Sequence, residues 1–236
     1  MTEKVNRPFS ASALKIIACV TMLIDHLGLV VFGNAMLLRL IGRIAMPIYC
    51  FLITEGAIHT RNKAKYIGRM LLFAFLSEIP FDLAVYGHCF YWGYQNVMFT
   101  LTLGLLCIFG MDYCRKKLPR AAAVIISILL LTAGSALAEL IESDYGLVGV
   151  WMIVVFYLFK KHSLALGLSL FFVVCPLTML RSGSFGIPTE IFALFALIPI
   201  RLYNGKKGIS GNFIKYAFYA FYPVHLLLLG LWRVLT

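Results

Sequence analysis

The chain has 236 residues and a net charge of +11, with 61% hydrophobic and only 13% charged residues. Because soluble domains carry roughly 25% charged residues, this composition excludes a soluble globular protein and indicates an integral membrane protein. The positive charge lies in short Lys and Arg clusters between hydrophobic segments, where it marks membrane topology and not a nucleic-acid-binding surface. The hydrophobic segments recur throughout the chain, so we expect one integral-membrane domain over residues 1–236.

The hydrophobic segments predict an all-α polytopic bundle of about nine transmembrane spans, within a range of about eight to ten, since about 17 to 25 apolar residues cross a bilayer as a helix. The first segment lacks a small-residue cleavage site, so we expect it to remain in the mature protein. The expected spans cover residues 13–33, 37–58, 65–86, 95–111, 120–140, 145–159, 163–180, 188–203 and 212–234.

The distribution of Lys and Arg predicts a cytoplasmic N-terminus, because positive residues concentrate in cytoplasmic connections. The opposite connections at 86–95 and 139–145 contain neither Lys nor Arg, and residues 90–94 form an aromatic cluster suited to the outer interface. The connection around Arg181 is an exception; nine spans place the C-terminus outside, and a re-entrant segment near residues 181–188 would reverse that. The cations expected inside are Lys4, Arg7, Arg61, Lys63, Lys65, Arg69, Arg115, Lys116, Lys117, Arg120, Lys160, Lys161, Arg201, Lys206 and Lys207.

Two common signatures are absent from the sequence. The six cysteines show no CxxC spacing, so we expect neither a disulfide framework nor a metal site. No glycine-rich nucleotide fingerprint is present, which argues against an ATP-driven pump.

Asp25 and His26 lie near the middle of the first hydrophobic segment. An ionisable residue at that depth costs about 2.5–3.5 kcal/mol on insertion scales and is by default a candidate for a functional site. At 1.5 Å of rise per residue, His26 is about 20 Å from the inner start of its span. Other spans carry polar residues at comparable depth: Arg39, Arg43, Glu78, Asp82, Tyr222 and His225.

This set of residues is suited to general base catalysis, in which a neutral imidazole removes a proton from an amine or hydroxyl nucleophile. Asp25 points about 100° away from its neighbour His26 around the helix, so Glu78 or Asp82 is the better candidate to orient the imidazole. Structural alternatives remain open. Arg43 paired with Glu78 or Asp82 would fix helix register, His26 would be a packed core histidine, and residues 222–225 would form only a kink.

A basic cluster at the inner ends of the second and third spans has two interpretations. It is either a positive-inside loop or a docking site for the phosphates of a nucleotide-like acyl donor. Its members are Arg61, Asn62, Lys63, Lys65 and Arg69.

The blocks LKIIACVTMLIDHLG, LRLIGRIAMPIYCFLITEGAIHTRNKAKYIGRML, SEIPFDLA, NVMFTLTLGL, DYGLVGV and FYAFYPVHLLLL together resemble the TraX family of membrane proteins. The founding member of that family acetylates the N-terminus of pilin, so the resemblance implies acetyl transfer from acetyl-CoA. The chain is also similar, more distantly, to transmembrane acyltransferases that use a membrane-embedded histidine in an early helix and accept acyl-CoA from the cytosol.

The resemblance implies roles for individual residues. The catalytic group would be His26 with Asp25, Glu78 and Asp82. The basic cluster described above supplies the expected cofactor-binding group for acetyl-CoA: Arg61, Asn62, Lys63, Lys65 and Arg69. The substrate-binding group would be Arg39, Arg43, Asn96, Tyr222 and His225. The acceptor would be a peptide, a sugar or a small amine. His26 would act directly as a base or carry the acyl group transiently.

We therefore expect a multi-pass acetyl-CoA-dependent acyltransferase in the lipid bilayer of a bacterial plasma membrane, without a metal or nucleic-acid partner. The main alternative is a proton-coupled secondary transporter, because intramembrane acids and histidines also form proton relays. A third is a structural membrane partner whose polar groups only join helices. The sequence leaves the oligomeric state open.

Overall fold

The computed structural model describes residues 7–160, 163–182 and 189–236, and in these ranges the chain is helical apart from its connections and two isolated β-bridges. The helices are α1 (Ala11–Val30), α2 (Met36–Gly42), α3 (Ala45–His59), α4 (Lys63–Tyr86), α5 (Val97–Lys117), α6 (Arg120–Leu140), α7 (Gly146–Phe159), α8 (Ser163–Ser182), η1 (Thr189–Ala196), α9 (Leu197–Arg201) and α10 (Asn212–Leu235). The all-helical fold predicted from the sequence is confirmed.

The expected spans coincide with these helices, with two differences. The second expected span is broken after Gly42 into α2 and α3, and the eighth consists of the 3₁₀ segment η1 followed by the short helix α9. Residues 183–188, which include the start of the eighth span and most of the expected re-entrant segment, lie outside the described residues, as do Lys4 and Lys161.

Among the described residues, five segments are long and apolar enough to cross a membrane: Ala11–Val30, Met36–His59, Val97–Lys117, Arg120–Leu140 and Asn212–Leu235. Two shorter apolar segments, Gly146–Phe159 and Ala165–Arg181, accompany them. The chain is thus a membrane protein by helix length and composition, while nine spans and a cytoplasmic N-terminus stay predictions.

Local sequence signals set several helix boundaries. The side chains of Ser10, Asn62 and Asn96 accept hydrogen bonds from first-turn N–H groups of α1, α4 and α5, which satisfies donors that have no partner within the helix. Gly87 ends α4 in the left-handed conformation at φ 76°, where a residue without Cβ carries no steric penalty.

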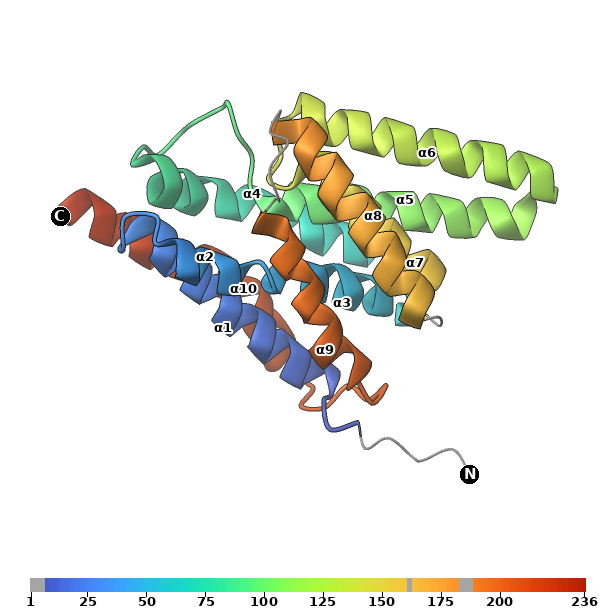
Figure 1. Cartoon of the computed structure of the whole chain (residues 1–236), viewed down its shortest axis with the longest axis horizontal. Helices are drawn as coiled ribbons and strands as arrows, with labels where there is room; N and C mark the ends of the chain where they lie inside the picture. Colours follow the sequence, from blue (N-terminus) through green and yellow to red (C-terminus); the bar gives the residue numbers. More distant parts are fainter. Residues whose placement is uncertain (1–6, 161–162, 183–188) are drawn as a thin grey trace.

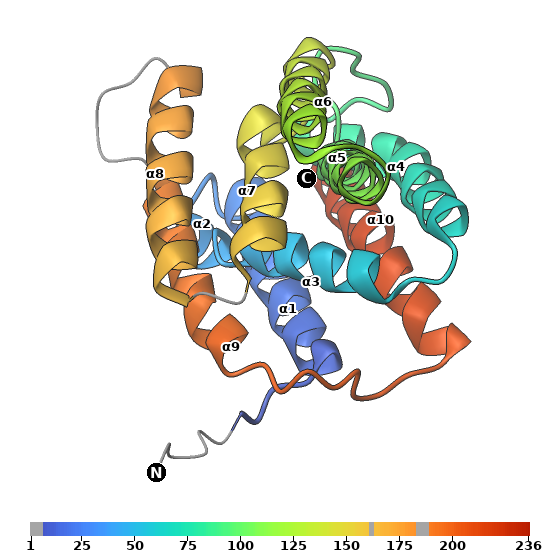
Figure 2. The same cartoon turned by 90° about the vertical axis from the view of Figure 1, so that its right-hand side faces the viewer.

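The first and last helices of the chain, α1 and α10, lie side by side, and α10 also packs along α4 (Figures 1 and 2). The helix α1 contacts α2 and α3 on its other sides, while α5, α6 and α7 form a neighbouring group that α8 borders. This arrangement brings side chains about 200 positions apart in sequence into one interior between α1 and α10.

Cation-rich and cation-free connections lie at opposite ends of the bundle. In Figure 1 the α5–α6 connection lies toward the right, whereas the α4–α5 loop and the C-terminus lie toward the left. Arg115, Lys116, Lys117 and Arg120 flank the α5–α6 connection. The separation agrees with the positive-inside pattern read from the sequence.

We expect a single cysteine at position 92 to react with a membrane-impermeant thiol reagent added to intact cells, and one at position 116 to react only after lysis. Trp92 is 86% exposed in the cation-free loop, and Lys116 lies at the cation-rich end. The experiment uses a background in which the six native cysteines are replaced. Labelling of position 116 from outside intact cells would contradict the cytoplasmic N-terminus.

Candidate functional site

Two buried histidines from opposite ends of the chain form the centre of the candidate site. Nδ1 of His26 in α1 lies 2.8 Å from Nε2 of His225 in α10, with ring centroids 5.0 Å apart. His26 is 9% exposed and His225 is 5% exposed. Nδ1 of His225 lies 2.7 Å from the carbonyl oxygen of Phe221. The sequence placed both histidines at similar depth, and the structure brings them into direct contact.

This hydrogen-bond pattern defines which ring nitrogens carry protons. The Phe221 carbonyl only accepts, so Nδ1 of His225 must donate to it. Burial without a counter-ion disfavours a charged ring, so His225 is neutral and its Nε2 accepts the hydrogen bond from Nδ1–H of His26. Nε2 of His26 is then the unprotonated, basic nitrogen of the pair.

Tyr222 lies beside this pair, with its ring centroid 6.4 Å from that of His26. The backbone of Val97, at the start of α5, approaches the Tyr222 hydroxyl. Tyr222 therefore connects the histidine pair to the first turn of α5.

Asp25 turns away from the histidines and toward α2, as its position one residue earlier on the helix requires. Its carboxylate lies 2.6 Å from Arg39 and 3.2 Å from Arg43. Arg43 also lies 3.2 Å from the Tyr145 hydroxyl and 3.5 Å from Glu190 in η1. The two arginines and two carboxylates thus compensate one another's charge next to the site.

Gly42 allows α2 to approach α1 closely. A Cβ at position 42 would overlap the Asp25 carboxylate. Gly42 therefore gives the carboxylate room to lie between the two helices and reach Arg39 and Arg43.

The predicted contacts of Glu78 or Asp82 with His26 or Arg43 were wrong. Glu78 accepts hydrogen bonds from both the backbone and the side-chain amide of Asn96, and Asp82 accepts one from the N–H of Tyr91 at 2.8 Å. Neither carboxylate contacts Arg43 or His26 among the hydrogen bonds of the described residues. Both acids instead hold the α4–α5 loop and the first turn of α5, and Asn96 is fully buried in this role. The imidazole of His26 is oriented by a second imidazole, because α10 and not α4 occupies that side of α1.

A further acid, Asp144, lies in the connection before α7 and was missed by the sequence analysis. The Tyr94 hydroxyl donates to its carboxylate over 3.1 Å. Burial raises the pKa of the Asp144 carboxyl, and the charge of Arg43 and the hydrogen bond from Tyr94 oppose that rise. Burial also raises the pKa of the Tyr94 hydroxyl. These groups extend the polar contacts around Arg43 toward the α4–α5 loop.

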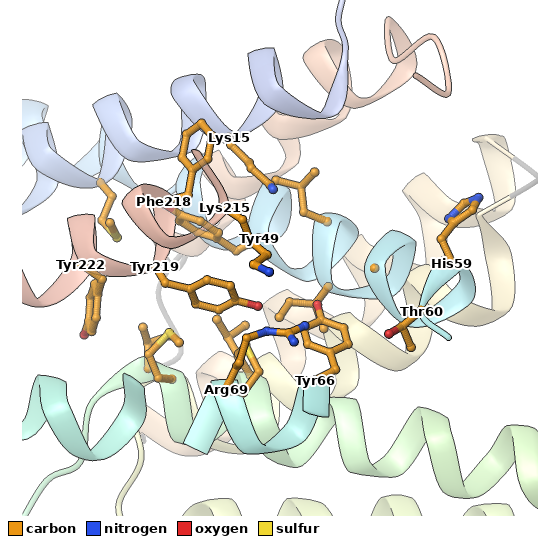
Figure 3. A pocket seen from close by; sticks show the side chains of 18 of the residues that line it. Lys15, Tyr49, His59, Thr60, Tyr66, Arg69, Lys215, Phe218, Tyr219 and Tyr222 are labelled. Carbon is orange, nitrogen blue, oxygen red and sulfur yellow. The ribbon is translucent and has the colours of Figure 1, made fainter. Parts of the chain in front are cut away.

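A cavity of about 390 Å³, here called the inner chamber, ends at Tyr222. Figure 3 shows Tyr222 on one side of it and His59 and Thr60 on the other, with the side chains of Lys15, Arg69 and Lys215 between them. Its walls are otherwise mainly apolar and aromatic, and include Met22, Tyr49, Ile53, Tyr66, Met98, Leu101, Phe218 and Tyr219. Basic, apolar and aromatic side chains thus line one cavity that reaches the neighbour of His26.

Four cations line the inner chamber, and none of them pairs with a carboxylate among the salt bridges of the described residues: Lys15, Arg69, Lys207 and Lys215. Nε of Arg69 is buried without a hydrogen-bond partner in the described structure. Lys15, Arg69 and Lys215 are half-buried, and Lys207 is exposed. The chamber therefore has the chemistry of a site for an anionic ligand.

The basic cluster predicted from the sequence contributes only Arg69 to this chamber. Lys63 pairs with Asp112 at 2.8 Å, Asn62 caps α4, and Arg61 and Lys65 are exposed away from the chamber lining. The spacing of residues along α1 and α10 does indicate the chamber-lining side chains that the basic cluster did not include. Lys15, Met22 and His26 follow one face of α1, and Lys215, Tyr219 and Tyr222 follow one face of α10 at three- and four-residue intervals.

Comparison with known proteins identifies the family. A family profile described as TraX protein matches residues 10–233. The chain belongs to the TraX family. A relative named probable fimbrial assembly protein FimC, serogroup H1, from Dichelobacter nodosus is 33% identical over 249 residues, which cover 95% of this chain and 96% of the relative.

A second relative of this TraX-family chain is similar over a short segment only. It is called uncharacterized protein RP591, from Rickettsia prowazekii (strain Madrid E), and is 50% identical over 38 residues, or 16% of this chain and 15% of the relative. No solved structure matches the chain.

We expect Asp25→Asn to lower the free energy of unfolding by about 3 kcal/mol, because it leaves two largely buried guanidinium groups without their shared carboxylate. The double variant Asp25→Asn, Arg43→Gln should lose much less unfolding free energy than the sum of the losses in the two single variants, since the partners interact directly. Denaturant unfolding in detergent, followed by tryptophan fluorescence, measures both quantities. Additive effects would contradict the pairing of Asp25 with Arg43.

Proposed function

We propose that this TraX-family protein is a membrane-embedded acyltransferase that moves an acetyl group from cytosolic acetyl-CoA to an amine or hydroxyl acceptor. One observation carries the proposal: a chamber lined by cations that form no salt bridge among the described residues ends at Tyr222, whose ring lies 6.4 Å from that of the basic histidine His26. The proposed location is the plasma membrane of a bacterium, with the N-terminus in the cytoplasm.

The chemistry of the inner chamber fits a CoA thioester. Such a donor has an anionic nucleotide end, a flexible pantetheine arm with two amides, and a reactive carbonyl at the tip. Lys15 and Lys215 would meet phosphate oxygens, Arg69 would donate a hydrogen bond inside the chamber, and the apolar and aromatic walls would enclose the arm. The guanidinium of Arg69 lines the chamber, with Cζ 5.6 Å from the centre of the Tyr66 ring.

In the proposed reaction, Nε2 of His26 removes a proton from the acceptor amine or hydroxyl as that group attacks the thioester carbonyl. The carbonyl oxygen becomes an oxyanion, and the O–H of Tyr222 is the nearby donor suited to stabilise it. When the carbon–sulfur bond breaks, the departing thiolate takes the proton from His26. The products are the acetylated acceptor and CoA, and the imidazole returns to its starting form.

The relative's name connects it with fimbrial assembly. An N-terminal amine of a pilin-like peptide is therefore the first acceptor to test, ahead of sugars and small amines. Acetylation of such an amine removes a positive charge, which alters how a peptide packs in an assembly.

We expect His26→Gln to lower acetyl transfer by about 100-fold or more, the usual size of a general-base contribution, while leaving CoA binding intact. His225→Gln should cost much less, because the amide oxygen still accepts from Nδ1–H of His26, whereas His225→Leu should cost roughly tenfold more than His225→Gln. Release of free thiol from acetyl-CoA by purified protein in nanodiscs, with a peptide amine as acceptor, measures these rates.

Two outcomes would contradict this assignment. If His26→Gln stayed within about threefold of the parent, far less than a general base contributes, the pair would be a packing feature. If the parent released no thiol but moved protons across liposome membranes, a proton-coupled transporter would be the better interpretation.

We expect Arg69→Gln to weaken acetyl-CoA binding by about tenfold, because a charged hydrogen-bond donor inside the chamber is lost. The double variant Arg61→Gln, Lys65→Gln is the control, since both residues are exposed and lie outside the chamber lining. It removes more charge from the same end of the protein and should leave the affinity unchanged. If both variants weakened acetyl-CoA binding equally, the basic cluster at residues 61–69 would be the better candidate for the donor site.

A further inference from the structure

A second cavity of about 570 Å³, here called the outer chamber, adjoins the inner chamber. The two chambers share lining residues: Lys15, Leu52, Gly56, His59, Lys207 and Lys215. The outer chamber is otherwise formed by the start of α1, the connection 203–211 and the first turns of α10. No step of the proposed reaction uses this space.

The connection 203–211 is held in place against α1. The Ser12 hydroxyl donates to the carbonyls of Lys207 at 2.8 Å and Ile209 at 2.7 Å, and the N–H of Ala11 donates to the carbonyl of Lys206 at 2.9 Å. Gly208, at φ 72°, makes the tight turn that brings the backbone close to Ser12. These bonds position Lys207 at the shared border of the two chambers.

The outer chamber carries uncompensated positive charge. Lys15, Lys207 and Lys215 line it, and none of them forms a salt bridge among the described residues. The carboxylate of Glu55 also lines it but is paired with Lys160. The charges that remain for a ligand are therefore cationic, and they lie where the two chambers meet.

The geometry points to the outer chamber as the subsite for the phosphates and nucleoside of a CoA thioester, with Lys207 and Lys215 selecting CoA over its pantetheine fragment. This inference rests on the proposed function for the thioester end, which lies in the inner chamber. Lys15 is about 16 Å from His26 along α1, and Lys215 is about 10 Å from Tyr222 along α10. A ligand that meets the lysines and also reaches Tyr222 must be a long molecule with an anionic end.

The remaining surface of the outer chamber suits a nucleoside. Tyr203, Ile209 and Ile214 supply aromatic and apolar area for a base, and Ser210 and Asn212 supply polar groups for a ribose. A free inorganic phosphate would occupy only a small part of this volume. An anionic lipid headgroup presents similar phosphate chemistry, so the experiment must separate these sources.

The test compares acetyl-CoA with S-acetylpantetheine, which lacks the nucleotide and its phosphates. In the double variant Lys207→Gln, Lys215→Gln we expect the preference for acetyl-CoA, measured as the ratio of the two kcat/KM values, to fall by about tenfold or more, since charged hydrogen bonds to phosphate are lost. The matched control is Arg115→Gln, Lys117→Gln, which removes the same charge from exposed positions outside both chambers. The control should keep the parent's ratio.

A binding arm separates this inference from the proposed function. Affinity for CoA, and competition by adenosine 3′,5′-bisphosphate, are measured in nanodiscs of zwitterionic lipid and again with phosphatidylglycerol. If the parent binds CoA but transfers no acetyl group, while the lysine variant loses CoA affinity, the result would support the subsite and contradict acyl transfer. Two results would overturn the subsite. One is an equal loss of kcat/KM with both thioesters, which leaves their ratio unchanged, and the other is displacement of CoA by phosphatidylglycerol.

Discussion

The burial of two adjacent ionisable residues in one helix constrains the whole arrangement. Asp25 and His26 point about 100° apart around α1, so no single neighbouring helix can satisfy both. Asp25 is satisfied by α2 through Arg39 and Arg43, and His26 by α10 through His225. The first helix must therefore lie between α2 and the last helix, which places the start and the end of the sequence in one site.

Whether a charge is paired distinguishes structural residues from candidate ligand residues in this fold. The arginines of α2 are compensated by Asp25 and Glu190, and Lys63 by Asp112. These pairs fix helix positions and leave little charge for a ligand. The lysines that line the two chambers form no salt bridge among the described residues, so their charge stays available to an anion. In the proposed function, these lysines form a localised cationic site for an anionic ligand.

Helical segments could be predicted from the sequence because hydrophobic length is a local property, and the breaks at Gly42 and in residues 189–201 are the main departures. The depth of His26 and His225 followed from counting helix rise. Their pairing could not be predicted, since it depends on α10 packing against α1 across nearly the whole chain. The expectation of a donor site at residues 61–69 follows from clustered charge, which is conspicuous in a sequence. Lys15 is a lone cation inside an apolar run, and only the structure shows that it lines a cavity with Lys215.

An imidazole suits the partner position of His26 better than the carboxylate that was expected there. A carboxylate would bury a full charge and require its own counter-ion at membrane depth, whereas neutral His225 accepts the same hydrogen bond without one. Asp25, although adjacent, is already neutralised by two arginines, so it offers little stabilisation to a protonated His26. In the proposed reaction the imidazolium is therefore a short-lived species, and its proton passes readily to the departing thiolate. The arrangement favours a base that returns to its neutral form within each turnover over one that stores charge in the membrane.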